Sequence, residues 1–179
     1  MGSGSTPKST NEKYYVGGVH PWLNTADVQD CVISKPQNYI TDLALQECNG
    51  LDFYPEDTVL LAMYGGGTIG NVGLMTFSST LNQACCAMMV NKKRVLPKFL
   101  FYKLNAHKEE IISNGCGATQ VNLSQGQIAR FSFLFPDLEA QSRIVSYLDV
   151  NTSTIDYRIS VLEQKRDAYG RLKKSIIND

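Results

Sequence analysis

The sequence predicts an α+β fold, with a strand-rich mixed α/β domain over residues 1–136 and a long coiled-coil-like helix over residues 137–179. Residues 1–136 contain short apolar or β-branched runs separated by glycines and polar turns, a pattern typical of short strands. Residues 138–169 contain neither glycine nor proline, and apolar residues recur there at helical spacing. Pro136 therefore marks the predicted boundary between the two parts.

Four strands and two helices are predicted within the first part. The strands are expected over residues 59–63, 72–77, 84–90 and 128–135, each an apolar or β-branched run. Residues 97–114 show helical spacing and end at Asn114-Gly115, a common helix stop. Ser124 and Gln127 have the spacing of a capping box and predict a short helix there.

The predicted long helix carries an apolar stripe with a seven-residue repeat. Its positions are Leu148, Ile155, Leu162, Tyr169 and Ile176, supplemented by Ile159 and Leu172. At 1.5 Å per residue such a helix is about 60 Å long, more than a domain of this size covers. We expect the stripe to contact another chain, as a homodimer or against a partner subunit. The alternative is a break near residues 151–153 that lets the helix fold back on its own domain.

The net charge of the 179-residue chain is zero, but its charges are segregated. Residues 36–91 contain five acids and no Lys or Arg, whereas residues 92–130 contain seven bases and two acids. Duplex DNA is held mainly through its phosphates, so a neutral protein that binds it needs a locally basic face. The segregation predicts either such a face or an ordinary solvated surface.

The composition is that of an ordinary globular protein, with 43% apolar and 19% charged residues. No apolar stretch approaches the roughly 18–20 residues of a membrane helix, and the N-terminus does not read as a secretory signal. The five cysteines lack a Cys-x-x-Cys pair. We therefore expect a cytoplasmic protein with reduced cysteines, no bound metal and no membrane partner.

A series of short motifs occurs in a fixed order along the chain. They are Gly4-Ser5-Thr6-Pro7, residues 17–23, Thr25-Ala26-Asp27-Val28, residues 55–60, the glycine turn at residues 65–70, Asn82-Gln83-Ala84, Gly117-Ala118-Thr119-Gln120 and residues 135–141. In this order they resemble the specificity subunits of type I restriction–modification systems. Those subunits usually carry two recognition domains and two long helices, so the chain resembles half of one.

The resemblance implies a non-catalytic subunit that recognises a DNA sequence. It would read one half of a split target in double-stranded DNA and position an adenine methyltransferase (M) subunit, with the restriction (R) subunit joining indirectly. S-adenosylmethionine, ATP and Mg would then be held by those partners, and this chain would hold no cofactor. The alternative is an interaction module, a truncated or regulatory half subunit that binds the methyltransferase without useful DNA affinity of its own.

Three polar loops and one basic segment are the candidate DNA contacts. Asn and Gln side chains pair with adenine, Ser and Thr with bases or phosphates, and glycines let backbone N–H groups approach a phosphate. The loop candidates are Ser5, Thr6, Lys8 and Ser9, then Tyr64, Gly65, Gly66 and Thr68, then Thr119, Gln120 and Asn122. Lys92, Lys93 and Arg94 are predicted to neutralise phosphates.

Each candidate also has a structural interpretation. The glycines of residues 65–70 are compatible with a turn that only requires positive φ. Gln83 and Gln120 are compatible with tying loops to the backbone, and Trp22 with a place in the core or a lid over the first loop.

Enzymatic interpretations are weaker. Residues 65–70 lack the Gly-Lys-Ser/Thr of a Walker loop, and a strand is predicted after them, where a dinucleotide turn would open a helix. Cys85 and Cys86 lie in an apolar run, which predicts buried and unreactive thiols.

Overall fold

The computed structural model describes residues 1–116 and 122–178, with the backbone only for residues 176–178. It divides into two compact units, Met1–Gln141 and Ser142–Asp179. The first unit holds all the strands of the described chain, and the second consists of helix alone. This is the predicted α+β class, and the first unit extends five residues beyond Pro136.

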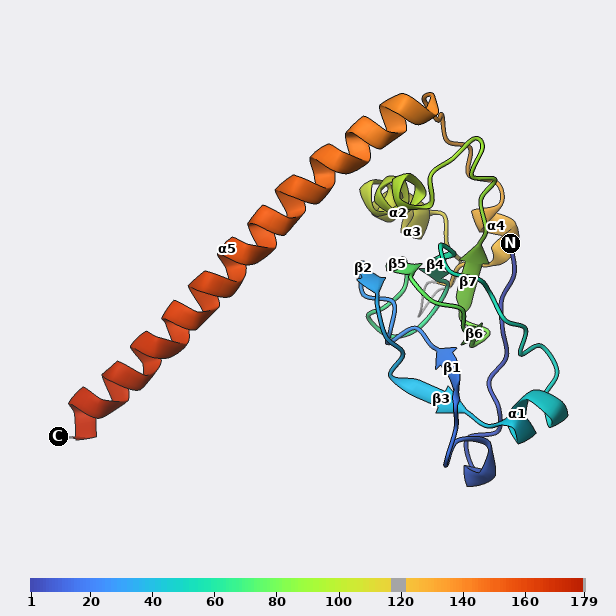
Figure 1. The fold of residues 1–179 in the computed structure, drawn as a ribbon, viewed down its shortest axis with the longest axis horizontal. Coiled ribbons are helices and arrows are strands. Elements are labelled where there is room, and N and C mark those ends of the chain that lie inside the picture. The colour runs from blue at the N-terminus through green and yellow to red at the C-terminus, as the bar shows by residue number, and fades with distance from the viewer. Residues whose placement is uncertain (117–121, 179) are drawn as a thin grey trace. The chain divides into compact units, whose positions relative to one another are not determined.

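The described residues of the first unit form two small sheets (Figure 1). The four-stranded sheet has the order β2 (Cys31–Ile33), β5 (Val72–Met75), β4 (Val59–Ala62) and β7 (Cys85–Met88). The three-stranded sheet has the order β3 (Asn38–Ile40), β1 (His20–Leu23) and β6 (Thr80–Leu81). The β2–β5 and β1–β6 pairs are parallel and the other pairs antiparallel.

In the described part of the first unit, five short helices accompany the sheets. They are η1 (Glu12–Tyr14), α1 (Asp42–Glu47), α2 (Pro97–Ala106), α3 (Lys108–Ser113) and α4 (Gln125–Ile128). In Figure 1, α2 and α3 lie on the side of the four-stranded sheet away from β1, β3 and β6.

Strand β4 shows why these residues form a central strand. All four of its residues are buried, which is typical of a strand covered on both faces. Because side chains alternate along a strand, Val59 and Leu61 join the core formed with α2 and α3. Leu60 and Ala62 join a second core on the opposite face, which includes Leu81 of β6. A continuous apolar run is therefore required here.

The predicted strands at residues 59–63, 72–77 and 84–90 are confirmed as β4, β5 and β7. The strand predicted over residues 128–135 is wrong, since Ile128 ends α4 and no strand follows it in the described chain. The outer edge of β7 is already occupied by Gly2, whose N–H and C=O bond to Ala87 at 2.9 and 2.7 Å. The alternation of Phe131 and Phe133 instead reflects rings that stack and pack on the core.

The helix predicted over residues 97–114 is divided in two at His107, whose φ of −108° and ψ of 17° are not helical. α2 places Leu100 and Leu104 in the core, and after the break α3 places Ile111 there. The capping box is confirmed: the amide N–H of Gln127 donates to Ser124 Oγ at 3.2 Å, and that of Ser124 donates to Gln127 Oε1 at 2.9 Å.

Helix α5 (Leu138–Asn178) has 41 residues and begins in the first unit. The break considered near residues 151–153 is not present. Asn151 and Thr152 donate from their side chains to the carbonyls of Tyr147 and Leu148, four residues earlier, at 2.7 and 2.8 Å. Back-bonding of this kind lets short polar side chains remain within a helix.

Gln141 joins the start of α5 to the first unit. Its side chain is fully buried and makes three hydrogen bonds to the backbone. Oε1 accepts from Leu96 N–H at 2.8 Å, and Nε2 donates to the carbonyls of Arg94 and Pro136 at 2.9 and 2.8 Å. Asp137 caps the helix by accepting from Ala140 N–H at 2.7 Å.

Replacing Gln141 with leucine is expected to lower the free energy of unfolding by about 3 kcal/mol. The change keeps the volume but leaves one buried N–H and two carbonyls without their partner, each at a cost of about 1 kcal/mol or more. Urea unfolding followed by circular dichroism measures the loss. Gln164→Leu on the exposed helix is the matched control and is expected to change the value by less than about 0.5 kcal/mol. Equal effects of the two variants would contradict the prediction.

Candidate nucleic-acid interface

The first polar loop is attached to the β6–β7 turn. Ser5 N–H donates to the carbonyl of Leu81 at 2.9 Å, and the Thr6 hydroxyl donates to Gln83 Oε1. Trp22 is buried and its indole N–H donates to the Ser5 carbonyl at 3.0 Å, so it lies in the core and also fastens this loop. Gln83 likewise ties one loop to another. Lys8 and Ser9 are exposed at the end of the segment.

The glycine turn follows β4 directly. Gly65, Gly67 and Gly70 have φ values of 129°, 84° and 76°, so the turn requires glycine for its backbone at these three positions. Gly66 has open space around its Cα and is exposed, whereas Tyr64 and Thr68 are partly buried. The conformational role of the glycines is therefore established. Two N–H groups of the turn are already bonded, since Thr68 donates to the Gly65 carbonyl at 3.2 Å and Gly70 to the Ala62 carbonyl at 2.9 Å.

The third loop can be placed only at its ends, because Thr119 and Gln120 lie outside the described residues. Cys116 and Asn122 exchange two backbone hydrogen bonds at 2.9 and 2.8 Å. The next residue, Leu123, donates its N–H to the carbonyl of Met63 at 2.8 Å. Asn122 is exposed and lies one residue from this contact.

These contacts bring the first loop, the glycine turn and the described ends of the third loop to one end of the four-stranded sheet. Met63, at the end of β4, donates its N–H to the carbonyl of Ala84 at 2.8 Å, while its own carbonyl accepts from Leu123. The glycine turn starts two residues later, at Gly65, and Gln83 beside Ala84 holds Thr6. Segments about 60 residues apart in the sequence thus meet at one end of a rigid sheet.

The basic triplet lies at the opposite end of that sheet. Lys92, Lys93 and Arg94 follow β7, whose last residue, Met88, is paired with Val59 at the start of β4. Lys92 makes an ion pair of 2.6 Å with Asp57, which precedes β4. Among the described residues, the structure does not bring this triplet together with the first loop, the glycine turn or Asn122.

The predicted basic face is partly neutralised. Besides the Lys92–Asp57 pair, Lys108 is paired with Asp30 at 2.7 Å. The ammonium of Lys103 lies 5.9 Å from the centre of the Phe133 ring. The basic segment of the sequence therefore does not form a uniformly basic surface, because some of its lysines are paired.

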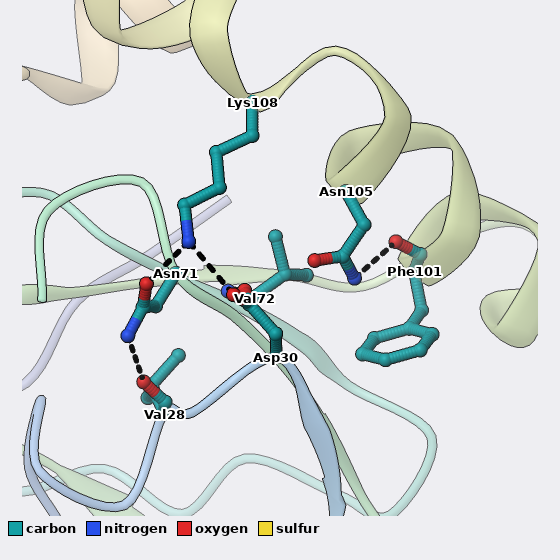
Figure 2. Close-up of polar contacts among 7 residues, drawn as sticks. All are labelled: Val28, Asp30, Asn71, Val72, Phe101, Asn105 and Lys108. Carbon is teal, nitrogen blue, oxygen red and sulfur yellow. Dashed lines mark hydrogen bonds and ion pairs between the residues drawn. The ribbon is translucent and has the colours of Figure 1, made fainter. Parts of the chain in front are cut away.

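Lys108 connects α3 to the end of the glycine turn (Figure 2). Its Nζ donates to Asp30 Oδ2 at 2.7 Å and to Asn71 Oδ1 at 2.5 Å, and Asn71 Nδ2 donates to the Val28 carbonyl at 3.0 Å. The other oxygen of Asp30 accepts from Val72 N–H at 2.8 Å. In the sequence Lys108 is one base among several, because its partners Asn71 and Asp30 are 37 and 78 residues away.

Replacing Lys108 with methionine is expected to loosen the end of the glycine turn. Hydrogen bonds to a charged group contribute about 1.5–3 kcal/mol, which we reduce to about 1 kcal/mol because the pair with Asp30 is partly exposed. Amide hydrogen exchange at residues 70–72 should become about fivefold faster, as mass spectrometry would measure. Lys13→Met, on an exposed side chain, should leave it unchanged. Unchanged exchange in the Lys108 variant would contradict this role.

Asp27 lies buried in the turn before β2. Its Oδ2 accepts from Asn24 N–H at 2.9 Å, and burial raises the pKa of its carboxyl group. Burial also raises the pKa of both strand cysteines, to about 11 for Cys86. Cys85 and Cys86 are fully buried, as the apolar run predicted, and thiols in this environment are poor nucleophiles.

All five cysteines are free thiols. Among the described residues, no group of three or more His, Cys, Asp or Glu side chains is placed to hold a metal ion. No helix in the described part of the chain is long and apolar enough to cross a membrane.

The stripe on α5 is largely exposed. Ile155, Ile159, Leu162, Tyr169 and Leu172 are 48–69% exposed, whereas Leu148 is partly buried. The side chain of Ile176 lies outside the described residues. Isolated exposed apolar residues are common, but a regular stripe of them along one helix is typical of an interaction surface.

The described chain combines a small α+β domain, with polar loops at one end of a sheet, and a long helix with an exposed apolar stripe. Residues 2–164 match the family described as the type I restriction modification DNA specificity domain. The chain belongs to this family, as the order of its motifs indicated.

Solved structures share the fold at 19% sequence identity. One is a chain from a study of complex assembly and conformational transition of the type I R-M system, with a TM-score of 0.75 over 98% of this chain and 41% of that one. The HsdS subunit from Thermoanaerobacter tengcongensis has a TM-score of 0.61, over 87% of this chain and 35% of that one. The type I restriction-modification S subunit from M. genitalium has a TM-score of 0.60, over 92% of this chain and 39% of that one. The chain thus spans about two fifths of the length of the solved chains it matches.

Proposed function

We propose that this chain reads one half of a split DNA target and positions a partner adenine methyltransferase on it. The observation that carries this proposal is the meeting of the first loop, the glycine turn and the Asn122 segment at one end of the four-stranded sheet. Base recognition requires polar side chains and close backbone approach on a rigid support, and this end of the sheet offers both. Membership of the DNA specificity domain family supports the same role.

The residues proposed to contact DNA are those of the predicted loops. Ser5, Thr6, Lys8 and Ser9 come from the first, Tyr64, Gly65, Gly66 and Thr68 from the glycine turn, and Thr119, Gln120 and Asn122 from the third. Thr6 is held by Gln83 and the glycine turn by the Lys108 network, so these neighbours would orient the loops.

The apolar stripe of α5 is proposed to form the contact with a second copy of the chain or with the methyltransferase. Paired helices would fix the separation between two half-sites, since a rigid helix sets the distance between the domains it joins. In this proposal the methyltransferase binds S-adenosylmethionine, the restriction subunit uses ATP and Mg, and the present chain is not catalytic.

The second candidate is an interaction module that binds the methyltransferase without useful DNA affinity of its own. The ion pairs of Lys92 and Lys108 favour it, because they leave less free positive charge in a protein of zero net charge.

A salt titration of DNA binding separates the two candidates. The probe is a pool of fluorescent duplexes with randomised sequence, and anisotropy is measured with the chain alone and with the methyltransferase, from about 50 to 200 mM salt. Selection from the pool should enrich one half-site, and log affinity should fall by about 0.9 per decade of salt for each phosphate contact. A flat salt dependence without enrichment, in the presence of methyltransferase binding, would establish the interaction module instead.

A further inference from the structure

A groove of about 720 Å³ lies beside the start of α5, within the first unit. Its walls are the turn after β7 and the segment that leads into α5. Apolar side chains form most of the lining, among them Val90, Val95, Phe135 and Leu138. Phe135 and Leu138 remain 37% exposed, so an apolar surface is open to solvent there.

The groove is framed by hydrogen bonds that hold its two walls together. Buried Gln141 bonds to the backbone of Arg94 and Leu96 on one wall and to that of Pro136 on the other. Arg94 and Val95 also donate their N–H groups to the Asn91 carbonyl at 2.8 and 3.0 Å, which closes the turn on itself. A preorganised groove loses little conformational entropy when it is filled.

The charged residues of the lining give the groove a basic character. Lys93 and Arg94 are exposed and line it together. The acid of the lining, Asp137, already accepts a hydrogen bond from Ala140 N–H as the cap of α5. Lys92, the third base of the triplet, pairs with Asp57 and is not part of the lining. Two bases above an apolar floor therefore complement a segment that carries both acids and apolar side chains.

Duplex DNA fits this groove less well than a protein segment does. A phosphate backbone is held by hydrogen-bond donors and leaves an apolar floor unused, whereas protein interfaces combine an apolar centre with a polar rim and are enriched in Arg. The groove also lies at the end of β4 opposite the three loops.

We propose that the groove of Val90, Val95, Phe135 and Leu138, with Lys93 and Arg94 at its rim, binds an acidic segment of a partner protein that inserts apolar side chains. This inference rests on the proposed function, in which that partner is the methyltransferase subunit. Lys93 and Arg94 then act in subunit assembly, and the DNA contacts come from the loops at the other end of the sheet.

The test measures two affinities for each of three variants: methyltransferase binding by calorimetry and binding of the duplex pool by anisotropy. Lys93→Glu with Arg94→Glu should weaken methyltransferase binding at least tenfold and leave the salt dependence of DNA binding by this chain unchanged. Lys13→Glu with Lys35→Glu is the matched control, since it alters the net charge equally on exposed lysines elsewhere, and should change binding less than twofold. Leu138→Ser should weaken methyltransferase binding without any change in charge.

The remaining outcomes overturn the inference in distinguishable ways. Reduced DNA affinity and a shallower salt slope in the Lys93/Arg94 variant, with methyltransferase binding intact, would make these bases phosphate contacts. Unchanged binding to both partners would leave the groove without this role. If the unaltered chain bound neither DNA nor the methyltransferase, the proposed function itself would fail, whatever the variants showed.

Discussion

Replacing Leu162 with aspartate should abolish self-association of the chain. Leu162 lies at the centre of the exposed stripe on α5 and is 63% exposed in the single chain. In a helix pair it would be buried against the second copy, and losing one buried leucine costs about 2 kcal/mol per chain before any cost of burying a charge. Two copies lose about 4 kcal/mol, which corresponds to roughly a 1,000-fold weaker dimer. Light scattering should then give the mass of a monomer.

Gln164→Asp is the matched control for this prediction. It introduces the same charge two residues further along, about 200° around the helix and away from the stripe. This variant should keep the mass of the unaltered chain. If the unaltered chain is already a monomer that becomes part of a complex only with the methyltransferase, the same pair of variants should be compared in that complex. If the Leu162→Asp variant still dimerised and still bound the methyltransferase, the stripe would belong to neither interface.

Replacing Gly4 with alanine should unfold the N-terminal segment and destabilise the first unit. A Cβ atom at this position would lie 1.7 Å from the Leu81 carbonyl oxygen, which belongs to the backbone of β6 and has little freedom to move. The segment would have to withdraw, with loss of the bonds from Gly4 N–H to Asn82 and from Ser5 N–H to Leu81. Overpacking and two lost hydrogen bonds together cost about 3 kcal/mol.

A fall of about 6–12 °C in Tm is expected for a chain of this length, and calorimetry would measure it. The first loop carries Ser5 and Thr6, so DNA affinity should fall with it. Gly126→Ala is the control, because that glycine lies in α4 with only the Ser124 hydroxyl within 4 Å, and alanine favours helix. The control should match or slightly exceed the stability of the unaltered chain. If the Tm of Gly4→Ala equalled that of the unaltered chain, the close approach of Gly4 to β6 would be refuted.

Local sequence patterns were sufficient where a structure depends on neighbours in the chain. The apolar run of β4, the Ser124–Gln127 capping box and the uninterrupted helix from Leu138 were all predicted, because burial on both faces, a reciprocal cap and helical spacing leave a local signature. The family could also be identified from the order of the motifs. The strands β1, β2, β3 and β6 were not predicted, since none of these short segments lies within a longer apolar run of the kind that contains β4, β5 and β7.

The predicted strand at residues 128–135 failed for a tertiary reason. Apolar residues do alternate in this segment, but it cannot pair with the outer edge of β7 because Gly2 already bonds to Ala87 there. The alternation is satisfied by ring packing of Phe131 and Phe133 instead. Period-two patterning therefore indicates alternating burial, and only the availability of a neighbouring strand turns it into a sheet.

The sequence by itself determined the fold class, the family and the glycine turn that follows β4. The tertiary structure alone decided which of the candidate residues lie close together. It joins Thr6 to Gln83, brings the glycine turn beside the Asn122 segment, and leaves Lys92, Lys93 and Arg94 at the other end of β4. The physical reason is that helix spacing, caps and turns depend on neighbouring residues. The position of a loop or a charge instead depends on strand pairing and on hydrogen bonds between segments far apart in the sequence.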